Sequence, residues 1–220
     1  MGTITRGAAA NFTTGGVILP AGINNASVAS ISSISQVNTA GGLNLIQVQT
    51  ASGSSSIAFE SKFTGYKAFL FTFTNVHFST NTQGIRVNFS TNAGGNYNAS
   101  KTTTHYRAYH QNNGGSNLLG YVTGSDLAQS TVDHQVSEDF VGDENDENIS
   151  GQMYIYNPNN TTFVKHFLTE TNGYHSGDYS VHSHTAGYVN TTSAVDGIKF
   201  IPSNGNFDAG TFALYGIGAV

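Results

Sequence analysis

The chain has 220 residues, of which 38% are hydrophobic and only 10% are charged, and it contains no cysteine. This length suits one sandwich or barrel domain with an extension, and the absence of cysteine excludes disulfides, thiolate zinc sites and cysteine nucleophiles. A net charge of −5 with only 8 lysines and arginines argues against nucleic-acid binding, which requires a basic surface.

Residues 1–56 differ in composition from the rest of the chain. They contain a single aromatic residue, Phe12, and are rich in Gly, Ala, Ser, Thr and Asn. The first ten residues lack the apolar region of a signal peptide, and no apolar run approaches the roughly 20 residues of a membrane span. Residues 43–49 (LNLIQVQ) predict a strand and residues 53–56 a loop. We therefore expect an extended attachment segment over 1–56, no membrane insertion, and a folded domain over 57–220.

From residue 57 onward, short strands alternate with turns. Phe69, Phe71 and Phe73 recur at every second position, which places three rings on one buried face of a strand. Further strands are predicted at 85–89, 105–109, 153–156, 163–168, 188–190, 198–201 and 211–217, with at most a turn or two of helix at 125–130. This pattern predicts an all-β antiparallel sandwich that resembles a jelly roll, because no stretch of helical length separates the strands.

Four residues near the C-terminal third suggest a metal site. His182 and His184 share one face if their segment is extended, and His175 and Asp178 are close in sequence, so two or three nitrogens and a carboxylate could converge on an ion. The simpler interpretation is a loop (YHSGDYSVHSH) whose side chains make surface hydrogen bonds or subunit contacts. We favour the simpler interpretation and expect neither a metal nor another cofactor.

Acidic residues concentrate at 138–148 (EDFVGDENDEN). Asp143, Asn145 and Glu147 have a spacing that suggests calcium, but the glycine and the terminal glutamate of an EF-hand loop are missing at the required offsets. We therefore interpret this segment as a solvated acidic loop. The sequence has no G-x-S-x-G motif, and its glycine pairs precede no helix, which argues against a serine hydrolase or a phosphate-binding loop. We expect a protein that is not an enzyme.

Tyrosines beside histidines and asparagines indicate a different kind of site. Tyrosine rings stack on sugars while Asn, His and Asp reach sugar hydroxyls, so such a surface can bind a glycan. The alternative is that these rings pack at the rim of the sandwich and leave only the hydroxyl wet. The candidate glycan-binding residues are Tyr106, Tyr109, Tyr174, Tyr179 and Tyr188.

The C-terminal stretch 190–217 (NTTSAVDGIKFIPSNGNFDAGTFALYGI) resembles the closing hairpin of virion structural proteins from tailed bacteriophages, particularly marine ones. Residues 69–109 are similar to the central strands of the same family. The resemblance implies a tail or fibre component, located in the virion after assembly in the host cytoplasm and release by lysis. The resemblance assigns no binding residue to this chain.

The resemblance also implies partners. Phage fibre and decoration subunits form symmetric assemblies, so we expect self-association, as a homotrimer, and contacts with other virion proteins. Three functions stay open. The chain is a tail or fibre-type subunit that contacts a host surface glycan, a capsid decoration (cement) protein or head fibre subunit, or a free carbohydrate-binding module or hydrolase.

Overall fold

The computed structural model describes residues 42–219, so most of the expected attachment segment, residues 1–41, lies outside the described residues. The described chain is built from strands and contains no helix. The strands are β1 (Leu43–Thr50), β2 (Ile57–Glu60), β3 (Tyr66–Phe78), β4 (Ile85–Ser90), β5 (Lys101–Gln111), β6 (Asn117–Tyr121), β7 (His134–Gln135), β8 (Ile149–Tyr156), β9 (Lys165–His175), β10 (Tyr179–Val189), β11 (Gly197–Pro202) and β12 (Phe207–Ala219).

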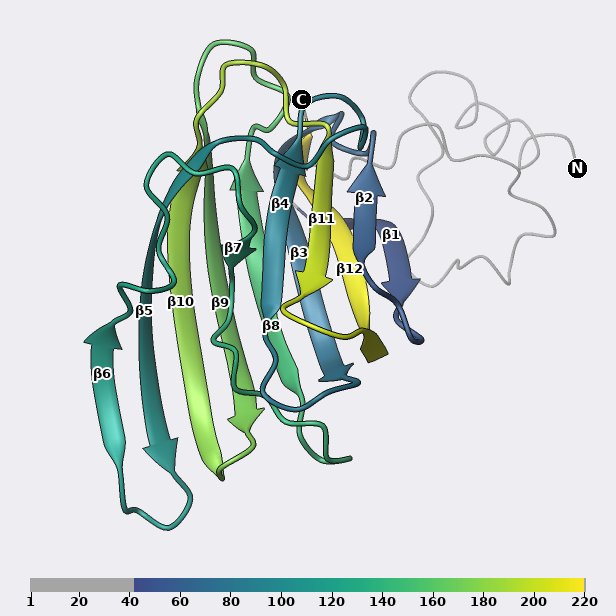
Figure 1. Ribbon diagram of the computed structural model, residues 1–220. Coiled ribbons are helices and arrows are strands. Elements are labelled where there is room, and N and C mark those ends of the chain that lie inside the picture. Colours follow the sequence, from purple (N-terminus) through teal and green to yellow (C-terminus); the bar gives the residue numbers. More distant parts are fainter. Residues whose placement is uncertain (1–41, 220) are drawn as a thin grey trace, which may run out of the picture. The chain divides into compact units, whose positions relative to one another are not determined.

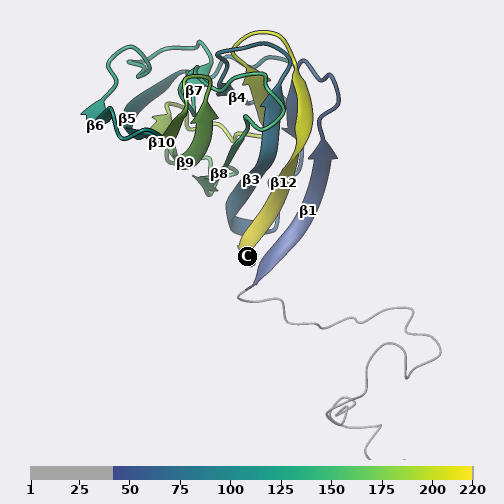
Figure 2. The same ribbon diagram turned by 90° about the horizontal axis from the view of Figure 1, so that it is seen from below.

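These strands form two antiparallel sheets of unequal width. The larger sheet has eight strands in the order β1-β12-β3-β8-β9-β10-β5-β6, and the smaller has four in the order β2-β11-β4-β7. The smaller sheet lies in front of the larger one in Figure 1, and Figure 2 shows β6 and β5 at one end of the larger sheet and β1 at the other. The chain passes back and forth between the sheets, which confirms the predicted jelly-roll-like sandwich.

Phenylalanine rings from both sheets fill the core. Phe71 of β3 lies 5.3 Å from Phe59 of β2 and 5.2 Å from Phe200 of β11, measured between ring centroids, and both pairs are edge-to-face. Phe69, Phe71 and Phe73 are all buried, as their alternation predicted. Edge-to-face pairs add to the hydrophobic gain of burial, so this cluster joins the two sheets.

The sandwich begins earlier in the chain than the sequence suggested. Strand β1 pairs with β12 from Leu43↔Ile217 to Thr50↔Thr211, and Ser54 forms a β-bridge with Phe207. Residues 43–49 are therefore a strand, as predicted, but this strand is an edge of the larger sheet. The boundary expected at residue 57 is corrected to residue 43.

The segment interpreted as a Tyr/His/Ser-rich loop is also a pair of strands. Its residues form the ends of β9 and β10, which pair from Tyr179↔His175 to Val189↔Lys165. The predicted strands at 163–168 and 188–190 cover only one end of β9 and of β10, because the inward face of both strands carries buried Thr169, Ser183 and Thr185 in place of large apolar residues. Residues 125–130 contain turns and no helix.

Candidate functional site

The larger sheet extends beyond the smaller one, and the chain between β6 and β8 covers part of the remainder. Residues 136–141 cross its inward face, where Thr171 Oγ1 donates a hydrogen bond to the Val136 carbonyl and the Glu138 N–H donates to Ser183 Oγ. Between this crossing segment and the strands lies a pocket of about 360 Å³. It is lined by Arg107, Tyr109, Glu138, Asp139, Phe140, His175, Tyr179 and Val181.

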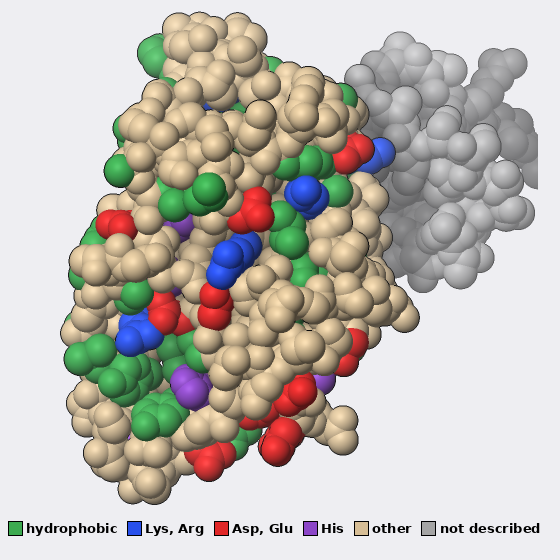
Figure 3. Space-filling view, in the orientation of Figure 1, with side chains coloured by type: hydrophobic (Ala, Val, Ile, Leu, Met, Phe, Trp, Pro, Cys, Tyr) green, Lys and Arg blue, Asp and Glu red, His purple; other side chains and the backbone are tan. Residues whose placement is uncertain are grey.

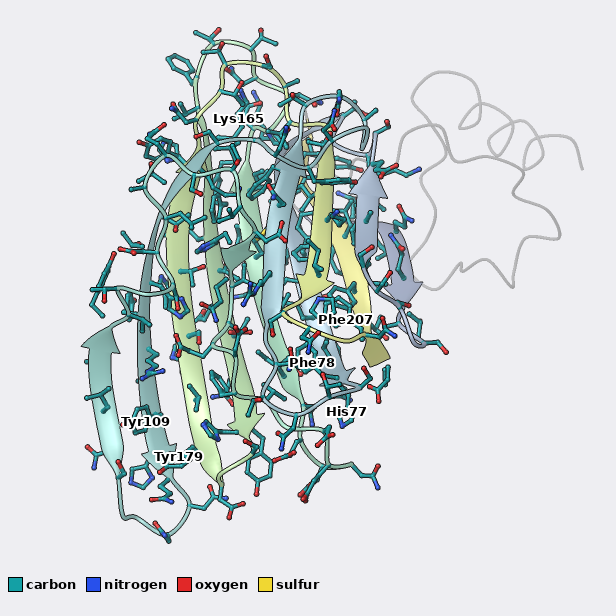
Figure 4. All side chains as sticks on the ribbon, viewed as in Figure 1. His77, Phe78, Tyr109, Lys165, Tyr179 and Phe207 are labelled. Carbon is teal, nitrogen blue, oxygen red and sulfur yellow. The ribbon has the colours of Figure 1, made fainter. Side chains whose placement is uncertain are left out.

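One wall of the pocket is aromatic. Tyr109 of β5 and Tyr179 of β10 meet edge-to-face at 5.4 Å between ring centroids, and Figure 4 shows them together at the lower ends of these strands. His175 lies 5.1 Å from Tyr179 and stacks parallel to Phe140 at 5.4 Å. Strand pairing explains this cluster, because Tyr179 is directly opposite His175 in the sheet. The wall offers ring faces and edges on which an apolar ligand surface can pack.

Two ion pairs adjoin the aromatic wall, and the Arg107 guanidinium lies over the Tyr109 ring, 5.6 Å from its centroid. Arg107 Nη1 donates to Glu138 Oε2, and Arg86 Nη2 donates to Asp139 Oδ2 at 2.6 Å. Because each carboxylate has its own guanidinium, the four side chains sum to no net charge. Figure 3 shows green, blue and red side chains together at the lower left, in the region of the labelled tyrosines. The pocket therefore offers strong donors and acceptors without a net charge from these four side chains.

Several polar atoms at the ion pairs have no hydrogen-bond partner within residues 42–219. Asp139 Oδ1, Arg107 Nε and Arg86 Nε are all buried and make no hydrogen bond. Buried polar groups in folded proteins are almost always paired, with protein, water or ligand. Asp139 and Arg107 line the pocket, but Oδ1 and Nε have almost no exposed surface, so a ligand there can reach these two side chains only through their other atoms.

His175 is neutral in this site. Burial is the main cause that lowers its pKa, and the charge of Arg107 lowers it further against the opposing effect of Glu147. The Gly177 N–H donates to His175 Nδ1 at 2.8 Å, which assigns the proton to Nε2. His175 thus contributes one N–H donor and an apolar ring.

Polar groups continue from the pocket into the core. His105 Nε2 lies 3.6 Å from Glu138 Oε1, and His105 and His134 are both fully buried. Among the described residues, neither ring has a hydrogen-bond partner, and the hydroxyls of Thr169 and Thr185 are also unpaired. Burial lowers the pKa of His105 to about 4 and that of His134 to about 3, so both rings are neutral at pH 7.

The five candidate tyrosines lie on opposite faces of the sheet. Tyr109 and Tyr179 line the pocket, whereas Tyr106, Tyr174 and Tyr188 alternate with inward residues and point away from the smaller sheet. On that outward side, Tyr106 stacks on His184 at 4.9 Å, Tyr174 Oη donates to Asp178 Oδ1, and Tyr188 Oη accepts from Gln129 Nε2. The sequence thus identified two tyrosines of the pocket, together with three that belong to a different surface.

The four metal candidates do not converge. His182 and His184 point outward, where His182 Nε2 lies 3.2 Å from Glu170 Oε1. His175 faces the pocket on the other side of the sheet, and Asp178 sits in the β9–β10 turn. Within residues 42–219, no three potential ligands lie close enough together to hold an ion.

The acidic segment was only partly interpreted correctly. Asp143, Glu144 and Asp146 are exposed, as a solvated loop requires. Glu138 and Glu147 are buried, and Glu138 and Asp139 bind arginines. One sequence signal for these ion pairs was available. Residues 42–219 contain only two arginines, Arg86 and Arg107, and both lie in or near predicted strands, where a carboxylate could pair with each of them.

Comparison with protein-family models, with curated proteins and with solved structures found no match. No helix long and apolar enough to cross a membrane occurs in residues 42–219. The fold and pocket define the chain, over these residues, as a β-sandwich protein with a polar and aromatic pocket beside its core.

Proposed function

We propose that the protein is a structural subunit of a bacteriophage virion, of the tail or fibre type, whose sandwich binds a sugar unit of a host surface glycan and catalyses no reaction. The observation that carries the binding proposal is the pocket itself, where Tyr109 and Tyr179 lie beside the ion pairs of Arg107 and Asp139. Its volume of about 360 Å³ lies within the usual range of ligand sites.

The chemistry of a pyranose matches this lining. Its axial and equatorial C–H groups form an apolar patch that packs on tyrosine rings. Its hydroxyls both donate and accept, so one can donate to the carboxylate of Glu138 or Asp139 while another accepts from the Arg107 guanidinium. Because the ion pairs carry no net charge, the pocket suits a neutral sugar and gives no advantage to an acidic one.

The arrangement of carboxylates supports binding without hydrolysis. A glycoside hydrolase uses one protonated carboxyl group and one carboxylate on either side of the scissile bond. Here Glu138 and Asp139 are adjacent in sequence, and each is engaged by an arginine. Neither is set up as a proton donor to a leaving group.

The virion assignment rests on the C-terminal sequence. Residues 190–217, which resemble the closing hairpin of phage structural proteins, form β11, the following turn and most of β12. Phe207 and Phe212 of β12 are buried in the core, so this hairpin completes the sandwich.

A capsid decoration protein is the second candidate. It is favoured by the outward side of the larger sheet, where exposed Leu119, Tyr106 and Tyr156 suit contacts with other proteins. The number of copies per particle, measured by mass spectrometry of purified virions, separates the two, because decoration proteins are far more numerous than fibre subunits.

A glycan array with matched tyrosine variants tests the binding proposal. We expect the wild type to bind neutral glycans, and Tyr179→Ala to weaken binding about tenfold through loss of ring contact. Tyr154→Ala removes a ring from the outward side of β8 and should leave binding unchanged. Release of reducing sugar should be absent. The proposal fails if no glycan binds, if both variants bind equally, or if any bound glycan is cleaved.

A further inference from the structure

The outward side of the larger sheet is a broad surface with almost no charge. We define the outer face as the even-numbered residues of β5, β8, β9 and β10 and the odd-numbered residues of β6, which all point away from the smaller sheet. On these strands Glu170 is the sole charged residue of the outer face, and tyrosine and histidine are its commonest large side chains.

Large hydrophobic side chains project from the outer face into solvent. Leu119 is 74% exposed, Tyr121 52%, and Tyr106 43%. Protein surfaces that bind other proteins are depleted in Lys and Glu at their centre and enriched in tyrosine. The outer face has this composition over the width of five adjacent strands.

The size of the outer face matches that of a stable interface. Five strands about 4.8 Å apart, each of about nine residues at about 3.3 Å per residue, span about 700 Å². A standard interface buries about 800 Å² on each partner. The outer face is therefore large enough to hold a partner without further contacts.

Charge determines which partner fits. Since the outer face contains no lysine or arginine, it cannot complement an acidic partner, and a single carboxylate cannot complement a basic one. The best complement is an equally uncharged surface with projecting side chains and hollows. The outer face is itself such a surface.

The two halves of the outer face are complementary in shape. A hollow of about 500 Å³ lies between β8 and β9, lined in part by Gln152, Glu170 and Asn172. Leu119 and Tyr121 project from β6. Tyr121 lies in the same row across the sheet as the hollow, because paired residues connect it to Glu170 and Gln152. These pairs are Tyr121↔Tyr106, Tyr106↔His184, His184↔Glu170 and Glu170↔Gln152.

We infer that the outer face is a dimer interface, in place of the homotrimer expected from the phage resemblance, and that a second copy of this chain packs on it by two-fold symmetry with the axis along β10. β10 is the central strand of the five, so this axis sets β6 of one copy over β8 of the other. Leu119 and Tyr121 of each copy then enter the hollow of its partner. The sugar pocket opens on the opposite side of the sheet and stays accessible, so this inference does not depend on the proposed function.

Light scattering of the full chain at micromolar concentration, with two adjacent leucine variants, tests the interface. We expect a dimer for the wild type. Leu119→Lys places a charge in the interface and should weaken the dimer by about tenfold or more. Leu118→Lys makes the same change one residue earlier, on a side chain that is also exposed but points to the other side of β6, and should leave the dimer intact.

Melting curves confirm that both variants fold, and glycan binding by each is measured separately. A monomeric wild type, a trimer, or a dimer that both variants affect equally would overturn the interface. A wild type that dimerises but binds no sugar would contradict the proposed function alone.

Discussion

Acid should destabilise this protein through two buried histidines. His105 and His134 are fully buried and neutral, with pKa values lowered by burial to about 4 and about 3. In the unfolded chain both rings titrate near 6.5. Between these pH values the unfolded state binds more protons than the folded state. The contribution of the two neutral histidines to the free energy of unfolding is therefore fully present above pH 6.5 and is lost as the pH falls toward 4.

The loss is large enough to measure at pH 5. At this pH an unfolded histidine is almost fully protonated while the buried rings stay neutral, so each histidine reduces the free energy of unfolding by about 2 kcal/mol. The two together account for about 4 kcal/mol, against a typical total of about 5–15 kcal/mol.

Urea unfolding at pH 7.5 and pH 5, followed by circular dichroism, measures this loss. His134→Leu removes one buried titrating ring and should reduce the difference between the two pH values by about 2 kcal/mol. His110→Leu removes an exposed histidine of the same strand as His105 and should leave the difference unchanged. Equal pH dependence in the wild type and His134→Leu would refute this reasoning.

Two further predictions concern stability. Lys101 is fully buried, and burial lowers its pKa to about 8, so the folded state binds fewer protons than the unfolded state between pH 8 and 10.5. The free energy of unfolding should rise by about 3 kcal/mol across this window, and Lys101→Met should flatten the rise in urea titrations. Gly151→Ala places a Cβ 2.3 Å from the Glu170 carbonyl and should lower the melting temperature by several degrees. A Cβ at Gly124 would meet no atom within 4 Å, so Gly124→Ala should leave the melting temperature unchanged. Equal shifts of the melting temperature in both variants would show that the close contact at Gly151 does not cause the loss of stability.

The core strands could be predicted from the sequence because their side chains follow the strand period. Phe69, Phe71 and Phe73 alternate with smaller residues and are all buried between the sheets. Strands β9 and β10 could not be recognised fully, since Thr169 and Thr185 occupy inward positions where periodicity expects large apolar residues. Under the crossing segment 136–141 the sheet buries polar groups, and no local pattern reveals this.

The site was predictable only in part, because its residues meet across long stretches of chain. Tyrosine content identified Tyr109 and Tyr179, but it did not separate them from tyrosines of the outer face. Glu138 pairs with Arg107, 31 residues away, and Asp139 with Arg86, 53 residues away. A run of acidic residues predicts a solvated loop, and only the folded structure shows that arginines lie beside two of these carboxylates.

A crystal structure with the strongest ligand from the glycan array tests the central claim most directly. We predict density for a sugar ring between Tyr109, Tyr179 and Asp139, with hydroxyls hydrogen-bonded to the charged side chains of Arg107, Glu138 or Asp139. Sugar density on the outer face, beside Tyr106 and His184, would contradict the account, as would a pocket left empty at saturating ligand.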